Sequence, residues 1–110
     1  MAKFEIYKDK KGEFRFRLKA GNGKLILVGE GYTSKANCLN GIESVRENTQ
    51  DNEKYDKLES TNGKLHFNIK AANGQVIGSS EMYESARGME NGMASVKKNA
   101  PRAKVVEILE

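Results

Sequence analysis

The sequence predicts an α+β fold in which two tandem β-β-β-α repeats and a closing strand share one mainly antiparallel sheet, with two helices on one face. Three observations lead to this prediction. The chain matches itself at an offset of 51 residues. Several short segments alternate apolar and polar residues, as half-buried strands do. Two longer segments carry apolar residues at helical spacing.

The internal repeat is the strongest signal in the sequence. Residues 12–48 align without gaps on residues 63–99, with 15 identities in 37 positions. Unrelated sequences of ordinary composition would share about two or three. The chain is therefore an internal duplication. The opening segment even occurs three times at this offset, as Phe4-Glu5-Ile6, Tyr55-Asp56-Lys57 and Val106-Glu107-Ile108.

The duplication also predicts the domain organisation. The polar stretch Thr49-Gln50-Asp51-Asn52 is too short to be a free linker between two domains. We therefore expect one domain spanning residues 1–110, made of copies at about 1–51 and 52–110, which pack closely against each other.

The strands follow from alternation with a period of two residues. Residues 14–19 and 65–70 each place apolar side chains on one face and polar ones on the other. The pairs Asn22-Gly23 and Asn73-Gly74 tolerate positive φ and close hairpins. The predicted strands are residues 4–7, 14–19, 25–28, 65–70, 76–77 and 105–109, with residues 55–57 as the middle occurrence of the opening segment.

The two helices are predicted from about Ser34 to Glu47 and from about Ser85 to Lys98, with each serine as N-cap. Glycine inside a helix costs about 1 kcal/mol relative to alanine. We therefore interpret the glycine on each apolar face as a close approach of helix to sheet. The two predicted apolar faces are Cys38, Gly41, Ile42 and Val45 in copy one, and Met89, Gly92, Met93 and Val96 in copy two.

The helix motif carries a family resemblance. The run Asn91-Gly-Met-Ala-Ser-Val-Lys-Lys-Asn-Ala-Pro101, with Asn40-Gly-Ile-Glu-Ser-Val-Arg-Glu-Asn48 in copy one, resembles the YegP-like family of small bacterial proteins of unknown function. The resemblance covers essentially the whole chain. It implies a β-β-β-α-β motif, two of which share a sheet and exchange their last strands. Copy one departs from the motif after Asn48. The family implies no activity.

Composition and charge limit the classes of function. The sequence has no apolar run of the roughly 18 residues that a membrane span needs, and its start has no apolar signal-peptide core. Cys38 is the single cysteine, so no internal disulfide can form. We expect a monomer in the cytoplasm. The net charge is +4, divided as +3 on residues 1–51 and +1 on residues 52–110, which is compatible with binding to anions.

The residue types that most often act in catalysis or metal binding are predicted to have structural roles in this chain. His66 is the single histidine and is predicted on the polar face of its strand, so a histidine metal site of ordinary spacing cannot form. Cys38 lies on the apolar helix face and is predicted to be a buried structural thiol. The run Gly21-Asn-Gly-Lys24 lacks the ending of a phosphate-binding loop. We predict no catalytic residue, cofactor or metal, and a protein that is not an enzyme.

The polar face of the sheet is the candidate site. If both helices cover the apolar face, aromatic and basic groups on the other face can stack bases and contact phosphates. The leading hypothesis is weak, sequence-tolerant binding of RNA or single-stranded DNA. The alternatives are a protein adaptor that uses a sheet edge or the Tyr32 and Tyr83 ends, a small-molecule enzyme, and a face that is merely solvated. The candidate polyanion-binding residues are Tyr7, Arg15, Arg17, Lys19, His66 and Lys70.

Overall fold

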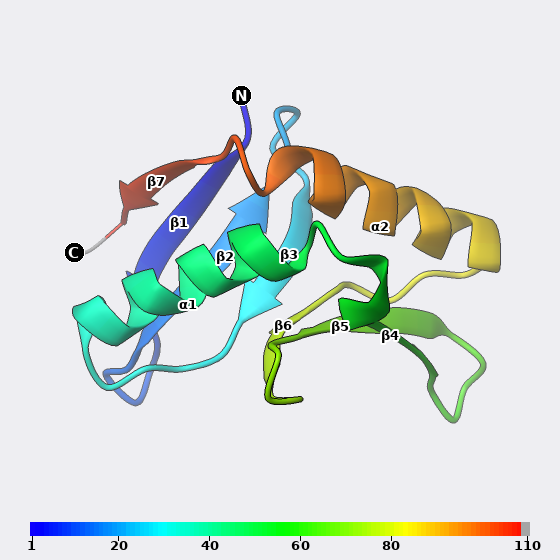
Figure 1. Cartoon of the computed structure of the whole chain (residues 1–110), viewed down its shortest axis with the longest axis horizontal. Helices are drawn as coiled ribbons and strands as arrows, with labels where there is room; N and C mark the ends of the chain where they lie inside the picture. Colours follow the sequence, from blue (N-terminus) through cyan, green and yellow to red (C-terminus); the bar gives the residue numbers. More distant parts are fainter. Residues whose placement is uncertain (109–110) are drawn as a thin grey trace.

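The fold is a seven-stranded sheet with two helices packed on the same face, as Figure 1 shows. The computed structural model describes residues 1–108. The elements in chain order are β1 (Lys3–Lys8), β2 (Phe14–Lys19), β3 (Leu25–Gly29), α1 (Lys35–Asn48), the 3-10 turn η1 (Asn52–Lys54), β4 (Tyr55–Glu59), β5 (Leu65–Lys70), β6 (Val76–Ser79), α2 (Ala86–Asn99) and β7 (Lys104–Glu107).

The strand order β4-β5-β6-β3-β2-β1-β7 reflects the duplication. The strands β1-β2-β3 and β4-β5-β6 form equivalent antiparallel meanders that meet where β3 pairs with β6. Both meanders shift register at the same place, between Leu18 and Lys19 and between Ile69 and Lys70. Among the described strands only β7 pairs in parallel, alongside β1. The closing strand of copy two thus completes the sheet of copy one.

Local chemistry explains where the turns and helices form. Gly23 and Gly74 both have φ of 84°, as the predicted hairpins require. Ser34 Oγ accepts a hydrogen bond from the backbone N–H of Asn37 at 3.1 Å, so the predicted N-cap of α1 is confirmed. The hydroxyl of Ser85 caps α2 in the same way. None of the helices within residues 1–108 is long and apolar enough to cross a membrane.

The core lies between the two helices and the covered face of the sheet. The helix faces predicted from the sequence are buried, except that Met93 is only partly buried. The largest fully buried apolar side chains are Phe4, Phe16, Phe67, Ile6, Leu18, Leu27, Ile42 and Ile69. Because they come from both copies, the two repeats are stabilised by one common core.

The predicted fold class is therefore confirmed, with adjustments at element ends. β6 continues to Ser79, two residues beyond the prediction, because its pairing with both β3 and β5 holds the Gly78-Ser79 segment extended. β7 begins at Lys104, one residue before its predicted start, where it enters the parallel ladder with β1. The predicted end of this strand at Leu109 lies outside the described residues.

Candidate functional site on the helix-free face

The sheet face opposite the helices carries a continuous row of side chains. Strand register aligns one residue from every strand, and these residues alternate with the buried ones. The row runs, from one edge to the other, through Val106, Glu5, Arg17, Val28, Ser79, Asn68 and Asp56. Charge is concentrated at the β1–β2 end of this row.

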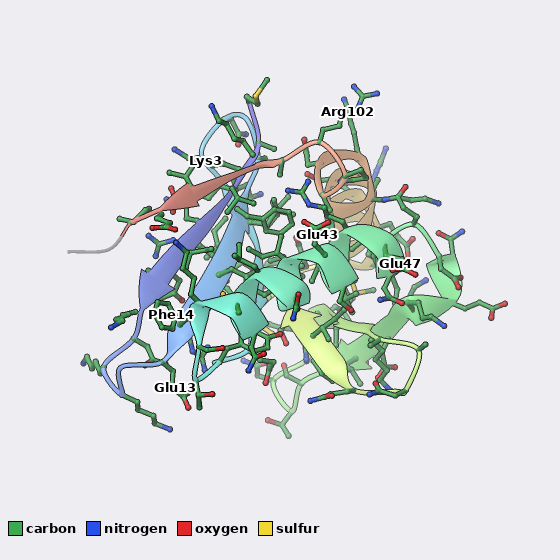
Figure 2. All side chains as sticks on the ribbon, turned by 60° about the vertical axis from the view of Figure 1, so that its left-hand side comes forward. Lys3, Glu13, Phe14, Glu43, Glu47 and Arg102 are labelled. Carbon is green, nitrogen blue, oxygen red and sulfur yellow. The ribbon has the colours of Figure 1, made fainter. Side chains whose placement is uncertain are left out.

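Three cations of copy one converge on a single carboxylate. Arg17 Nε donates to Glu5 Oε1 at 2.7 Å, and Lys19 Nζ lies 3.2 Å from the same oxygen. Lys3 Nζ lies 3.6 Å from Glu5 Oε2. Figure 2 shows Lys3 at the start of β1, beside β7 and at the far end of the hairpin from Glu13. We call Lys3, Glu5, Arg17 and Lys19 the Glu5 cluster; its three cations and one anion leave two positive charges in excess.

Glu5 is buried although it belongs to the uncovered face. Its exposure is 3%, because the long basic side chains cover it. Burial by itself would raise the pKa of Glu5, but hydrogen bonds from Arg17 and Lys19 outweigh burial and hold the pKa below its ordinary value of 4.5. Glu5 is therefore ionised at neutral pH and holds the heads of these cations in place.

Replacing Glu5 tests this arrangement. We expect Glu5→Gln to lower the free energy of unfolding at pH 7 by about 1–2 kcal/mol, because charge-assisted hydrogen bonds are lost next to partly exposed cations. A carboxyl whose pKa is lowered in the folded state stabilises the protein above its unfolded pKa and loses that contribution as pH falls through the folded pKa. As the pH falls below about 4.5, the free energy of unfolding should therefore decrease less in the variant than in the parent protein. Urea melts of both proteins from pH 7 to pH 3 measure this, and parallel curves would contradict it.

The structure divides the predicted site residues into two groups. Tyr7, Arg15, Arg17 and Lys19 lie together on β1 and β2, where Tyr7 is directly opposite Arg15. The other two, on β5, are separated from β2 by β6 and β3. With strands spaced about 4.8 Å apart, this separation is roughly 14 Å. The six predicted residues therefore do not form one compact site.

The aromatic and basic groups of copy one are largely engaged with each other. The Arg17 guanidinium lies 4.6 Å from the centroid of the Tyr7 ring and covers one face of the ring. Arg15 Nε donates to Asp9 Oδ2 at 3.0 Å. Arg17 and Lys19 balance the buried charge of Glu5, so a change at either residue affects the stability of the fold as well as the charge of the site.

The residues of copy two have less cationic character. Lys70 Nζ lies 3.2 Å from Asp56 Oδ2. His66, which the alternation predicts to be exposed, is half-buried opposite Leu58, because this position pairs it with an apolar side chain. Its Nδ1 is buried without a hydrogen-bond partner among the described residues. Copy two therefore adds little positive charge to the helix-free face.

The other residues singled out in the sequence pack against the core of the protein. Cys38 is fully buried, which raises the pKa of its thiol, so its predicted burial is confirmed. Tyr32 and Tyr83, the candidate adaptor ends, are half-buried and stack on Phe16 and Phe67. Within residues 1–108 no group of three or more His, Cys, Asp or Glu residues is arranged to hold a metal ion.

Sequence reasoning missed Glu5 as the organiser of the site. Alternation along residues 4–7 places Glu5 on the polar face, but it does not show which residue of the next strand lies opposite. The Asp9–Gly12 turn supplies that information, because a hairpin centred on Lys11 places Glu5 directly opposite Arg17. An acidic residue facing a basic one across a hairpin is the signal that could have found this pair.

Comparison with known proteins identifies similar sequences and structures. The family model described as a domain of unknown function, DUF1508, matches twice, at residues 9–56 and 60–107. A UPF0339 protein encoded in the ptx operon 5′ region of Stutzerimonas stutzeri is 54% identical over 96% of this chain and 95% of its own length. YegP of Escherichia coli K12 is 54% identical over 87% of each chain.

Two solution NMR structures have the same fold. The structure of YegP from E. coli, described as a protein of unknown function, superposes with a TM-score of 0.93 at 49% identity and covers 98% of this chain and 93% of its own. A UPF0339 protein from Shewanella oneidensis gives a TM-score of 0.92 at 42% identity, with 98% and 92% covered. The resemblance suggested by the helix motif is thus confirmed, over 98% of this chain in the structural comparisons.

Proposed function

The chain belongs to the DUF1508 family that includes YegP, and we propose that this member is a binding module for single-stranded nucleic acid, which it contacts through phosphates at the Glu5 cluster. The observation that carries the proposal is the convergence of three cations on one buried carboxylate. Two positive charges remain in excess, and their positions are fixed before a ligand arrives.

The surroundings of the Glu5 cluster favour phosphate contacts over base recognition. Lys104 of β7 is aligned with Lys3 in the sheet and extends the cationic area to the sheet edge. Arg17 already covers one face of Tyr7, so the site offers a limited surface for stacking a base. Binding that depends on phosphates is sequence-tolerant and salt-dependent.

The helix side of the molecule has a different distribution of charge. Glu43 and Glu47 lie on the outward surface of α1, and Arg102 lies beyond the end of α2, as Figure 2 shows. Lys97 and Lys98 belong to the last turn of α2. These two lysines provide a matched control, because they carry the same kind of charge on the opposite face of the sheet.

Opposite charge changes within the Glu5 cluster test the proposal. We expect Lys19→Gln to weaken binding of labelled single-stranded DNA and RNA regardless of sequence, and to reduce the salt slope by about 0.7, because one phosphate is no longer neutralised. Glu5→Gln should strengthen binding at low salt, because the gain of one net positive charge outweighs the loss of the carboxylate that holds the cations in place. Fluorescence anisotropy at low and moderate salt measures both, with folding of each variant checked by circular dichroism.

The controls decide where binding occurs. Replacing both Lys97 and Lys98 by glutamine should leave affinity nearly unchanged. Tyr7→Ala should have little effect if phosphates are the main contact, whereas a loss of about 1–3 kcal/mol would indicate a stacked base. No binding at low salt, or an equal loss from the α2 lysines, would remove the proposal.

A further inference from the structure

The two edges of the sheet differ in a way that the duplication does not predict. β4 pairs with β5 in the same antiparallel manner as β1 pairs with β2. β1 then has β7 as a parallel neighbour on its other side. Within residues 1–108, β4 has no neighbour on its outer side and ends the sheet. The position equivalent to that of β7 is therefore unfilled next to β4.

The backbone groups at this edge can be assigned from the ladder. Ser60 N–H donates to Lys64 O, so these two residues form a hydrogen-bonded pair at the hairpin end. Leu65 exchanges its backbone hydrogen bonds with Tyr83, on the side of β5 away from β4. By alternation, the N–H and C=O groups of Lys57, and of the residues two positions before and after it, point away from β5. The N–H of Tyr55 already donates to Asn52 O, so the groups that can pair with another strand are the C=O of Tyr55 and both backbone groups of Lys57 and Glu59.

A surface depression lies beside β4, at the side where a further strand would add to the sheet. It lies between β4 and α2, has a volume of about 340 Å³, and we call it the β4–α2 groove. Tyr55 and Met93 in this groove are partly buried, whereas their copy-one counterparts Phe4 and Ile42 are fully buried. The groove is lined by Asn52, Tyr55, Lys57, Glu90, Met93, Ala94 and Lys97.

β7 shows which side chains such a position accepts. Val105, aligned with Phe4, packs against the core, and Glu107, aligned with Ile6, makes an ion pair with Lys35 of α1. An apolar residue thus faces the core, and an acidic residue lies two positions later. At the other edge the residue equivalent to Ile6 is Lys57, which is exposed in the groove.

We propose that the β4 edge and the β4–α2 groove bind an extended peptide segment of a partner protein, which adds to the sheet as an eighth strand parallel to β4. The segment carries an apolar side chain over Tyr55 and Met93, and an acidic side chain facing Lys57. Lys57 is at present paired with Glu90 at 2.8 Å in an exposed position, so an incoming carboxylate competes with a weak contact. Main-chain hydrogen bonds supply affinity, and the groove supplies selectivity.

Charge argues against a second copy of the chain as the occupant. Antiparallel pairing of two β4 strands about their centre would place Lys57 opposite Lys57, and like charges directly opposite destabilise a sheet. β7 of a second copy is already paired with its own β1 and packs Val105 against its own core. The partner is therefore a different polypeptide with alternating apolar and acidic residues.

The chain supplies a suitable probe. A fluorescein-labelled peptide with the sequence of residues 102–110 reproduces the strand that fills the equivalent position at β1. We expect it to bind the full-length protein with an anisotropy increase, and to perturb amide resonances of β4 and α2. A peptide with aspartate in place of Val105 should bind at least about tenfold more weakly, because it places a charge against the apolar part of the groove.

A pair of protein variants isolates the backbone contribution. Lys57→Pro removes an N–H that points away from β5, a position where an edge strand tolerates proline, and should weaken peptide binding at least about tenfold. Lys57→Ala keeps the N–H and should weaken binding only about two- to threefold through the lost charge. Thermal melts check that both variants fold, and Met93→Gln tests the groove without changing β4.

Four results would overturn the proposal. One is no binding at millimolar peptide. Another is perturbation of β1 instead of β4, which would indicate exchange with the chain's own β7. The third is self-association of the free protein that Lys57→Pro abolishes, which would make a second copy the occupant. Equal effects of Lys57→Pro and Lys57→Ala would also exclude strand addition.

Discussion

Neither copy, prepared alone as residues 1–51 or 52–110, is expected to fold as a monomer. Residues 1–51 would lose β7, which belongs to copy two but pairs with β1 of copy one, and residues 52–110 would keep β7 without the β1 strand that pairs with it. Each would also expose the side chains of β3 or β6 at the junction where the copies now meet. The expected result is an unfolded chain or a dimer that restores the missing contacts.

The physical reason lies in contacts that cross between the copies. α1 packs against β5 and β6 of copy two as well as β2 of its own copy, and α2 packs against β3. Arg46 Nη1 donates to the carbonyl oxygens of Ala100 and Pro101, at 3.2 Å and 3.1 Å. Gln50 Nε2 donates to the carbonyl oxygen of Lys97 at 2.9 Å. A separated half leaves these groups and part of the core in water.

Sedimentation and thermal melts of each half measure this expectation. The full-length chain should sediment as a monomer and unfold in one transition, whereas each half should show no cooperative transition or should sediment as a dimer. Mixing the two halves should restore a folded complex, because the cross-copy contacts do not require a covalent connection. A stable monomeric half with a cooperative melt would show that the copies are independent domains.

The elements set by local chemistry could be predicted from the sequence. The serine N-caps of both helices and the Asn-Gly hairpins act within three or four residues, so short motifs suffice to identify them. The internal repeat extended this local information to both copies and predicted that they share one sheet, but it did not predict the order of the strands in that sheet.

Features that depend on distant strands could not be predicted in the same way. Burial of Glu5 depends on three long side chains that fold over it from two strands. The three related segments form β1, β4 and β7. The position beside β4 is unfilled because β7 lies next to β1, at the other edge of the sheet. Helical spacing places Met93 on the apolar face, and its partial burial follows from the missing neighbour of β4.

The two helix glycines are the sites where the smallest change should have a large effect. We expect Gly41→Ala and Gly92→Ala each to lower the free energy of unfolding by about 2 kcal/mol, and both together by about 4 kcal/mol, because overpacking at a tight contact costs up to about 3 kcal/mol. Alanine would favour each helix by about 1 kcal/mol, which offsets only part of this cost. The sequence predicted a close approach of helix to sheet, and the structure shows that a tyrosine side chain makes it.

The tyrosines explain why the added methyl groups cannot be accommodated. A Cβ at Gly41 would lie 2.7 Å from Tyr32 Cζ and closer still to its hydroxyl, and Gly92 faces Tyr83 in the same way. Each ring stacks on a buried phenylalanine with centroids 6.4 Å apart, so it cannot shift without disturbing the core. Burial of the two rings also raises the pKa of both hydroxyls.

A double-mutant cycle tests this explanation directly. In a Tyr32→Ala background the steric cost disappears, so Gly41→Ala should become neutral or stabilise by up to about 1 kcal/mol through helix propensity. Asn40→Ala is the control, because it introduces the same alanine at the neighbouring exposed position of α1, where no side chain is overpacked, and it should not destabilise. Urea unfolding of the four proteins gives the coupling energy, which we expect to be about 2–3 kcal/mol. A coupling near zero would mean that the glycine is required by the helix backbone and not by the tyrosine ring.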